Sequence, residues 1–146
     1  GPLAEVLADV KMPIETENGA SVVLSGKVSS LSSEWKTCCI DAGGWTFETP
    51  TASLAMSSQV RLRVLARDVS IAVEKPDSIS IRNRLQAEVE EIVAHPSEPA
   101  YQLVKLKCPN GEGRLVSRIL NQSVTELGLH PGSQVWALVK ASAVIM

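Results

Sequence analysis

One pattern occurs twice along this chain of 146 residues, and the repeat constrains the fold more than any other feature. Residues 57–71 (SSQVRLRVLARDVSI) align with residues 132–146 (GSQVWALVKASAVIM) through a shared Ser-Gln-Val, at an offset of 75 residues. Nearer the N-terminus, residues 24–31 (LSGKVSSL) align with residues 85–92 (LQAEVEEI) at an offset of 61 residues. Such self-similarity predicts two units that share one fold.

The first repeated segment alternates apolar or small residues with polar ones, as a strand with one buried face requires. Its inward positions are Leu24, Gly26 and Val28, after which the phase slips by one residue to Leu31. The second copy slips in the same way, to Ile92. A one-residue slip indicates a β-bulge, which bends a strand and helps a small barrel to close.

Further strands follow in each unit, separated by turns that contain glycine or proline. They are expected at 35–42, 45–48 and 57–71 in the first unit and at 101–108, 113–119 and 132–146 in the second. The last strand is expected to run almost to the end of the sequence, with Lys140 in its middle. The only helical signal is in residues 121–132, where Ser123 and Glu126 have the spacing of a capping box and Gly128 ends the turn.

These elements predict an all-β fold of two tandem small OB-like Greek-key barrels, with one short helical turn in the second. Residues 21–76 are expected to form the first barrel, in degenerate form, and residues 77–146 the second. Residues 1–20 are interpreted as an expression scar at Gly1-Pro2 followed by a linker or remnant. We therefore expect this sequence to be a piece of a longer protein.

Composition and missing motifs exclude several classes of function. A net charge of −2 and 3% aromatic residues argue against a nucleic-acid partner, which needs clustered basic residues or stacking rings. No apolar run approaches the roughly 18 to 20 residues of a membrane span. Cys38, expected to face inward, Cys39, expected to face outward, and Cys108 are interpreted as reduced thiols, and His95 and His130 as surface residues. There is no P-loop, nucleophile–base pair or acid pair, so neither enzymatic activity nor ATP binding is expected of this chain.

Three segments of the second unit carry groups that can donate hydrogen bonds to an anion. They are SISIRNRL (78–85), the turn at 120–123 before the helical signal, and the Lys-Ala-Ser run of the last strand. The candidate residues are Ser80, Arg82, Asn83, Ser123, Lys140, Ala141 and Ser142. An ammonium within a buried strand needs a partner. Two cations, hydroxyls and backbone N–H groups together suit a tetrahedral dianion.

Such a site would discriminate between oxyanions. When every ligand is a donor, phosphate is penalised because it carries a proton of its own near neutral pH. Sulfate, molybdate and tungstate carry none, so cavity size must separate them. Composition and spacing alone leave simpler interpretations open: Lys140 reaches water from a strand end, and Ser123 spends its hydroxyl on a helix cap.

The segments SIRNRLQAEVEEI and LNQSVTELGLHPGSQVWALVKASAVIM resemble a Mop (molbindin) domain, also called a transport-associated OB or TOBE domain. The resemblance covers about residues 78–146 and rests on three motifs in order: S-x-R-N, the serine turn before LGL, and V-K-A-S. Residues 63–83 further resemble the C-terminal region of the ATP-binding subunit of bacterial molybdate ABC transporters, where two such units occur in tandem.

This resemblance implies a cytoplasmic regulatory domain that senses intracellular molybdate or tungstate, bound as an oxyanion and not as a metal ion. It implies that Arg82 and Lys140 are the cations beside the ligand, with Ser80, Ser123 and Ser142 as hydroxyl donors. It also implies a homodimer through the Mop units, with sites between protomers. In the parent transporter the partner would be a membrane permease subunit, which would place the domain at the inner membrane.

The sequence departs from the family pattern in two places. Many members carry Thr or Ser where this chain has Leu120, so one hydroxyl is missing. In the first unit, Leu65 and Arg67 align with Lys140 and Ser142, so that unit is expected to be structural or to contribute only through Arg67. The alternatives to a regulatory domain are a free-standing molybdate store, a purely structural dimerisation module, and an OB fold that binds nucleic acid.

Overall fold

The computed structural model describes residues 20–51 and 54–146, so the predicted linker lies, up to residue 19, outside the described residues. The strands are β1 (Ser21–Ser32), β2 (Thr37–Ala42), β3 (Trp45–Pro50), β4 (Gln59–Leu65), β5 (Ser70–Ala72), β6 (Asn83–Ala94), β7 (Tyr101–Lys107), β8 (Arg114–Leu120) and β9 (Gln134–Val139). Within the described ranges, the other elements are one helix, α2 (Asn121–Glu126), and two 3-10 turns, η1 (Ala66–Asp68) and η2 (Ala141–Ala143).

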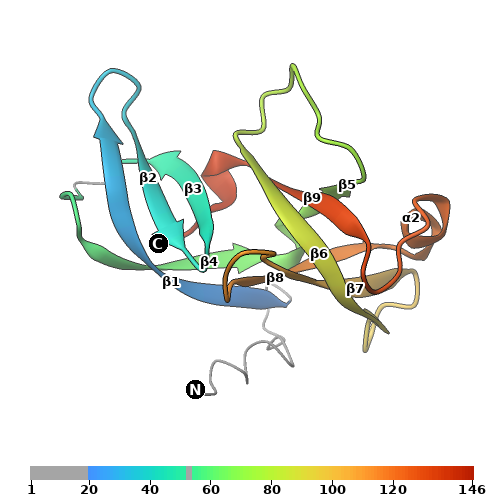
Figure 1. The fold of residues 1–146 in the computed structure, drawn as a ribbon. Helices are drawn as coiled ribbons and strands as arrows, with labels where there is room; N and C mark the ends of the chain where they lie inside the picture. The colour runs from blue at the N-terminus through green and yellow to red at the C-terminus, as the bar shows by residue number, and fades with distance from the viewer. Residues whose placement is uncertain (1–19, 52–53) are drawn as a thin grey trace.

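The strands form two antiparallel sheets that lie side by side (Figure 1). The first has the order β3-β2-β1-β4 and the second the order β5-β9-β6-β7-β8. Buried residues of both sheets form one apolar cluster, whose largest fully buried side chains include Phe47, Ile40, Leu62, Leu106 and Leu115. The predicted all-β fold of two tandem units with one short helix is confirmed.

The two predicted bulges are present. The pairing of β1 with β2 shifts register between Val28 and Ser30, and the pairing of β6 with β7 shifts between Val89 and Glu91. These positions are separated by the same 61 residues that separate the aligned sequences. The local phase slip therefore reported a real feature of the backbone.

The predicted strands 57–71 and 132–146 are wrong as continuous elements. Each breaks after the Ser-Gln-Val strand into a 3-10 turn, η1 after Leu65 and η2 after Lys140. The break allows the chain to leave one sheet and pair with the other. Ser70 of β5 pairs with Leu138 of the second sheet, and Ile145 forms a bridge with Arg63 of the first.

This exchange is reciprocal. Adding the repeat offset of 75 to Ser70 gives Ile145, and subtracting it from Leu138 gives Arg63. The segment after the Ser-Gln-Val strand of each unit, which we call its tail, thus pairs with the other unit through equivalent positions. The two units are related by an internal pseudo-two-fold axis. Although β5 lies within the range expected for the first barrel, it pairs in the second sheet.

Two glycine turns meet where the units touch. Gly113 N donates a 2.8 Å hydrogen bond to Gly43 O, which joins the β7–β8 turn to the β2–β3 turn. A Cβ at Gly43 would lie 2.5 Å from Gly113 Cα, and Gly43 has a φ of +64°. Glycine is therefore required here both for the backbone conformation and for the close approach.

Helix α2 corrects one local prediction. It begins at Asn121 without a side-chain cap, so Ser123 is its third residue and the predicted capping box is wrong. Glu126 instead accepts a 2.9 Å hydrogen bond from the side chain of Gln122. Gly128 ends the turn as predicted, with a φ of +64°. No helix within the described residues is long and apolar enough to cross a membrane.

The predictions for the cysteines agree with the structure, whereas one of the two predictions for the histidines does not. All three cysteines are free, and Cys38 is buried whereas Cys39 is partly exposed, as the alternation predicts. Burial, and to a smaller extent charge on Cys39, raises the pKa of the Cys38 thiol. His130 is exposed, but the surface assignment of His95 is wrong. His95 is buried, and its Nδ1 accepts hydrogen bonds from two backbone N–H groups of the following loop.

Candidate functional site

The register of β6 and β9 brings together the two cations that the sequence singled out. Asn83 pairs with Val139 at the end of this antiparallel ladder. Arg82 and Lys140 are the next residue on each strand, so both leave the ladder at the same end, which we call the Arg82 end. Both residues are exposed, and among residues 20–51 and 54–146 Lys140 has no ion-pair partner.

Asn83 joins the Arg82 end to strand β3 of the first unit. Its side-chain oxygen accepts a hydrogen bond of 2.7 Å from Glu48 N, and its side-chain nitrogen donates one of 3.0 Å to Glu48 O. The residue is only 2% exposed. Asn83 thus pairs with the backbone of an edge strand as another strand would. Its carboxamide positions the scaffold of the site and is not free to reach a ligand.

Glu48 is a site residue that sequence reasoning missed. Arg82 Nε donates a 2.9 Å hydrogen bond to Glu48 Oε1, and the two side chains are 63% and 24% exposed. The remaining guanidinium nitrogens of Arg82 have no partner within the described ranges. Because 34 residues separate the pair in sequence, no local motif could have indicated it. No signal in the sequence separated Glu48 from the other carboxylates of the first unit.

The Lys-Ala-Ser run also reaches β3. Thr49, which is 2% exposed, donates a 3.3 Å hydrogen bond from Oγ1 to Ala141 O in η2. Ala141 is partly exposed and Ser142 is exposed. The backbone of Lys140 is extended before the turn begins, with φ −61° and ψ 146°. Lys140, Ala141 and Ser142 therefore lie at the surface beside β3 and next to Arg82.

The two remaining candidates are placed differently. Ser80 is exposed in the loop before β6, two residues from Arg82. Ser123 lies in α2, at the outer end of the second unit, whereas η2 lies beside β3 (Figure 1). One chain therefore brings together Arg82, Asn83 and residues 140–142, with Ser80 nearby in sequence, but it does not bring Ser123 to them.

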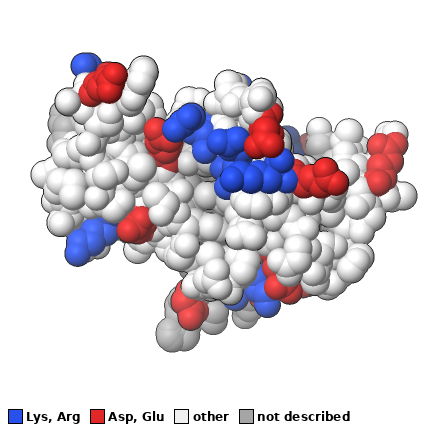
Figure 2. Space-filling model, turned by 45° about the horizontal axis from the view of Figure 1, so that its top comes forward, with Lys and Arg blue, Asp and Glu red and all other residues white. Residues whose placement is uncertain are grey.

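The electrostatics of this face are mixed. Figure 2 shows basic side chains gathered near the middle of the face that is uppermost in Figure 1, with acidic side chains directly beside them. At the Arg82 end, Glu48 offsets one of the two positive charges. On this face the basic side chains are therefore interrupted by acidic ones (Figure 2) and do not form the continuous basic stripe typical of a nucleic-acid-binding protein.

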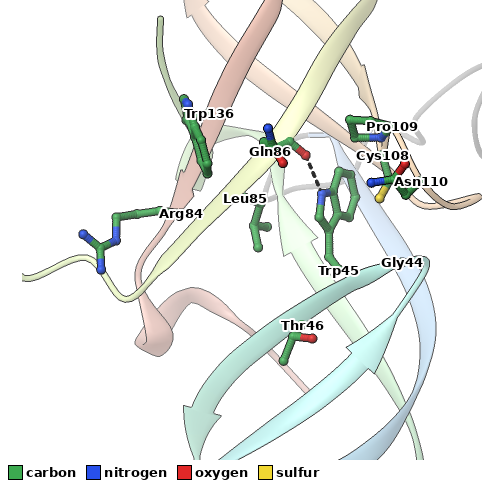
Figure 3. Close-up of a pocket in the computed structure, with 10 residues that line it drawn as sticks. All are labelled: Gly44, Trp45, Thr46, Arg84, Leu85, Gln86, Cys108, Pro109, Asn110 and Trp136. Carbon is green, nitrogen blue, oxygen red and sulfur yellow. Dashed lines mark hydrogen bonds between the residues drawn. The ribbon is translucent and has the colours of Figure 1, made fainter. Parts of the chain in front are cut away.

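A separate pocket of about 270 Å³ lies between the two units. It is lined by Gly44, Trp45, Thr46, Arg84, Leu85, Gln86, Cys108, Pro109, Asn110 and Trp136 (Figure 3). Trp45 Nε1 donates a 2.7 Å hydrogen bond to Gln86 O across it. Arg84 points away from Trp45 and donates to Pro76 O at 3.0 Å. None of the predicted site residues lines this pocket. In the described part of the chain there is no cluster of three or more side chains suited to a metal ion.

Comparison with known proteins identifies the second unit. The TOBE domain family matches residues 79–146. The molybdenum import ATP-binding protein ModC of Brucella abortus (strain 2308) is 41% identical over 138 residues, which are 94% of this chain and 37% of that protein. ModC of Methylococcus capsulatus is 32% identical over 145 residues, which are 99% of this chain and 40% of that protein. The chain thus spans about two fifths of the length of these relatives.

A solved structure agrees with the sequence relatives. The cytoplasmic molybdate-binding protein ModG, with molybdate bound, superposes with a TM-score of 0.71 and 28% sequence identity. The match covers 92% of this chain and 97% of ModG, so both tandem units are included. Residues 79–146 thus match the TOBE domain family, and the chain as a whole is similar to part of the molybdenum import ATP-binding protein ModC and to ModG.

Proposed function

We propose that this chain binds a tetrahedral oxyanion, molybdate or tungstate, at the Arg82 end. The observation that carries the proposal is the register of β6 and β9, which sets Arg82 and Lys140 next to one another beyond the pair Asn83 and Val139. Two exposed cations at one strand end attract a dianion more strongly than either would alone. The molybdate-bound ModG structure supports this choice of ligand.

Each candidate residue has a role in the proposal. Arg82 and Lys140 supply positive charge, and Ser80 and Ser142 supply hydroxyl donors. The backbone N–H of Ala141, the first residue of η2 directly after Lys140, supplies a further donor in this proposal. Asn83 acts indirectly, because it holds β3 against the site through Glu48.

Ser123 requires a second copy of the chain. It lies at the outer end of its own unit, so in this proposal it reaches the oxyanion of a partner in a homodimer. A site shared between protomers would link ligand binding to association. Mixing Arg82→Ala and Ser123→Ala variants tests this, because a heterodimer would contain one site with both residues intact. Recovery of about a quarter of the wild-type sites is expected, and no recovery would contradict a shared site.

The relatives support a biological setting for this proposal. As part of a molybdenum import ATP-binding protein, the chain would work in the cytoplasm, beside a membrane permease subunit, and would regulate import according to the molybdate concentration. It would bind no ATP itself. ModG, which the match covers almost completely, favours a second candidate: a free-standing molybdate-binding store. A molybdate-dependent change in the ATPase rate of the complete parent protein supports regulation, and an unchanged rate favours storage.

Isothermal titration of the purified chain with molybdate, tungstate, sulfate and phosphate tests the proposal directly. Heat is expected from the first two ligands only. Arg82→Ala and Lys140→Ala should each weaken binding about 10- to 100-fold, since hydrogen bonds to charged groups contribute about 1.5 to 3 kcal/mol. Arg114→Ala is the matched control. Arg114 Nε lies 3.1 Å from Glu90 Oε1, and this ion pair is remote from the Arg82 end. If none of the four ligands released or absorbed heat, only the interpretation as a structural dimerisation module would be left.

A further inference from the structure

Glu48 is a carboxylate placed next to a site proposed for an anion. We propose that Glu48 sets the affinity of that site: it holds Arg82 through Nε and at the same time repels the oxyanion that Arg82 binds. The inference rests on the proposed oxyanion site and adds a residue from the other unit. It makes the first unit, which lacks the binding motif, part of the control of binding by the second.

The position of Glu48 is fixed by its backbone. Both its N–H and its C=O are paired with the buried carboxamide of Asn83, at 2.7 and 3.0 Å. Its side chain is 24% exposed, less than half the exposure of the Arg82 side chain at 63%. The carboxylate is therefore the better-anchored member of the pair, and Arg82 is oriented by Glu48 more than the reverse.

The contact leaves Arg82 able to bind a ligand. Only Nε is paired with Glu48, so the two terminal nitrogens of the guanidinium remain without a partner among the described residues. Terminal guanidinium nitrogens can bind two oxygens of an anion in a fork. An oxyanion on these nitrogens would not displace Glu48, and the carboxylate would stay close to the bound dianion.

The expected size of the effect follows from Coulomb's law. A carboxylate about 7 Å from a dianion in a water-like dielectric weakens binding by roughly five- to tenfold. The effect should fall as salt is added, because the pair is exposed to solvent. The equivalent position in the second unit is Val116, since Lys105 pairs with Val116 as Cys39 pairs with Glu48. The carboxylate is thus present at only one of two equivalent positions.

Glu48→Gln removes the charge but keeps an oxygen that can accept the hydrogen bond from Arg82 Nε. We expect this variant to bind molybdate roughly five- to tenfold more tightly than the wild type at low salt, with a smaller gain at high salt. Glu90→Gln is the matched control, because Glu90 also accepts a hydrogen bond from an arginine Nε, that of Arg114. Glu90 lies seven residues beyond Asn83 along β6, which is roughly 20 Å in an extended strand. The dissociation constant of this control variant should stay within about twofold of the wild type.

Glu48→Ala separates the two parts of the inference. It removes both the charge and the hydrogen bond that orients Arg82, so it should bind less tightly than Glu48→Gln. Equal or tighter binding by Glu48→Ala would overturn the claim that Glu48 holds Arg82. Unchanged or weaker binding by a folded Glu48→Gln, with Arg82→Ala still defective, would overturn the affinity-setting role and leave the oxyanion site intact. No binding by the wild type would overturn both.

Discussion

The two ends of the contact between the units share a backbone design but differ in chemistry. At one end Thr49 of β3 donates a hydrogen bond to Ala141 O, and at the other Ser117 of β8 donates one to Val69 O at 2.5 Å. Cys38 pairs with Thr49 as Val104 pairs with Ser117, so the two hydroxyls are equivalent. Each ties the exchanged tail of one unit to the edge strand of the other.

The side chains around these hydroxyls do not match. The repeat alignment places Leu65 and Arg67 where the second unit has Lys140 and Ser142. Asn83, which clamps β3, is matched in the first unit by the buried Val22. The comparison teaches that the exchanged tails and bulges build the scaffold, whereas the proposed oxyanion chemistry depends on a few substitutions at one end.

The largest effect is expected where the two units touch most closely. Gly43→Ala should destabilise the chain by about 3 kcal/mol or more, because the new Cβ meets the Gly113 backbone and φ is positive. Gly128→Ala has the same φ of +64° but no atom within 4 Å of the new Cβ, so it should cost only about 1 kcal/mol. Urea unfolding of both variants measures the difference. Equal losses would mean that the glycine contact does not hold the units together.

The next largest effect is expected at the two hydrogen bonds between the Asn83 side chain and the Glu48 backbone, a clamp that has no counterpart at Val22 in the first unit. Asn83→Ala should lower the free energy of unfolding by about 2 to 3 kcal/mol, because it leaves the N–H and C=O of Glu48 unpaired in a partly buried setting. Val22→Ala, at the equivalent position, removes only apolar contacts. It should change the hydrogen-exchange rates of the β8 amides less than Asn83→Ala changes the rate of the Glu48 amide. Faster exchange at the Glu48 amide in Asn83→Ala is the specific signature, and an unchanged rate would contradict the clamp.

A smaller loss of stability, similar at both ends, is expected when either of the equivalent hydroxyls is removed. Ser117→Ala and Thr49→Val should each cost about 1 to 2 kcal/mol, the usual range for a buried hydrogen bond. The loss should be greater for Ser117, which is fully buried with the shorter bond, than for Thr49. Thermal unfolding provides the ranking. A reversed ranking would show that the two ends are not held in the same way.

The smallest effect is expected from copying a residue of the second unit into the first. Cys38→Val reproduces Val104 and should change stability by less than about 1.5 kcal/mol at pH 7. Because the folded pKa of Cys38 is raised, the wild type should lose stability as pH rises above the ordinary value of 9.0, where the unfolded thiol ionises first. The valine variant should lack this loss. An identical alkaline profile for both proteins would argue against the raised pKa.

Features of the fold that depend on local pattern were predictable from the sequence. The alternation and its slip at Leu31 and Ile92 located both bulges, because side-chain period and register are linked within a strand. The exchange of tails was not predictable in this way. Residues 140–146 keep an apolar pattern whether they continue one strand or cross to another sheet, so only tertiary pairing distinguishes the two paths.

The same limit applies to the candidate site. Arg82 and Lys140 were singled out from the sequence as two cations that suit a dianion, and the register of β6 and β9 places both at one end of the same ladder. Glu48 could not be singled out, because its contact with Arg82 depends on how two units pack. The capping box at Ser123 failed for a similar reason: the helix begins two residues earlier, at Asn121, whose backbone N–H bonds to Ala100 O and whose side chain bonds to Pro99 O.

Crystals of this chain soaked in tungstate would test the central claim most directly, because tungsten gives an anomalous signal that locates the anion. The account predicts a peak within hydrogen-bonding distance of Arg82 and Lys140, with Ser123 of a second copy beside it. A peak at the other end, near Arg67, would contradict it. So would a structure with no peak in which the Lys140 ammonium extends into solvent and Arg82 lies far from it in every assembly.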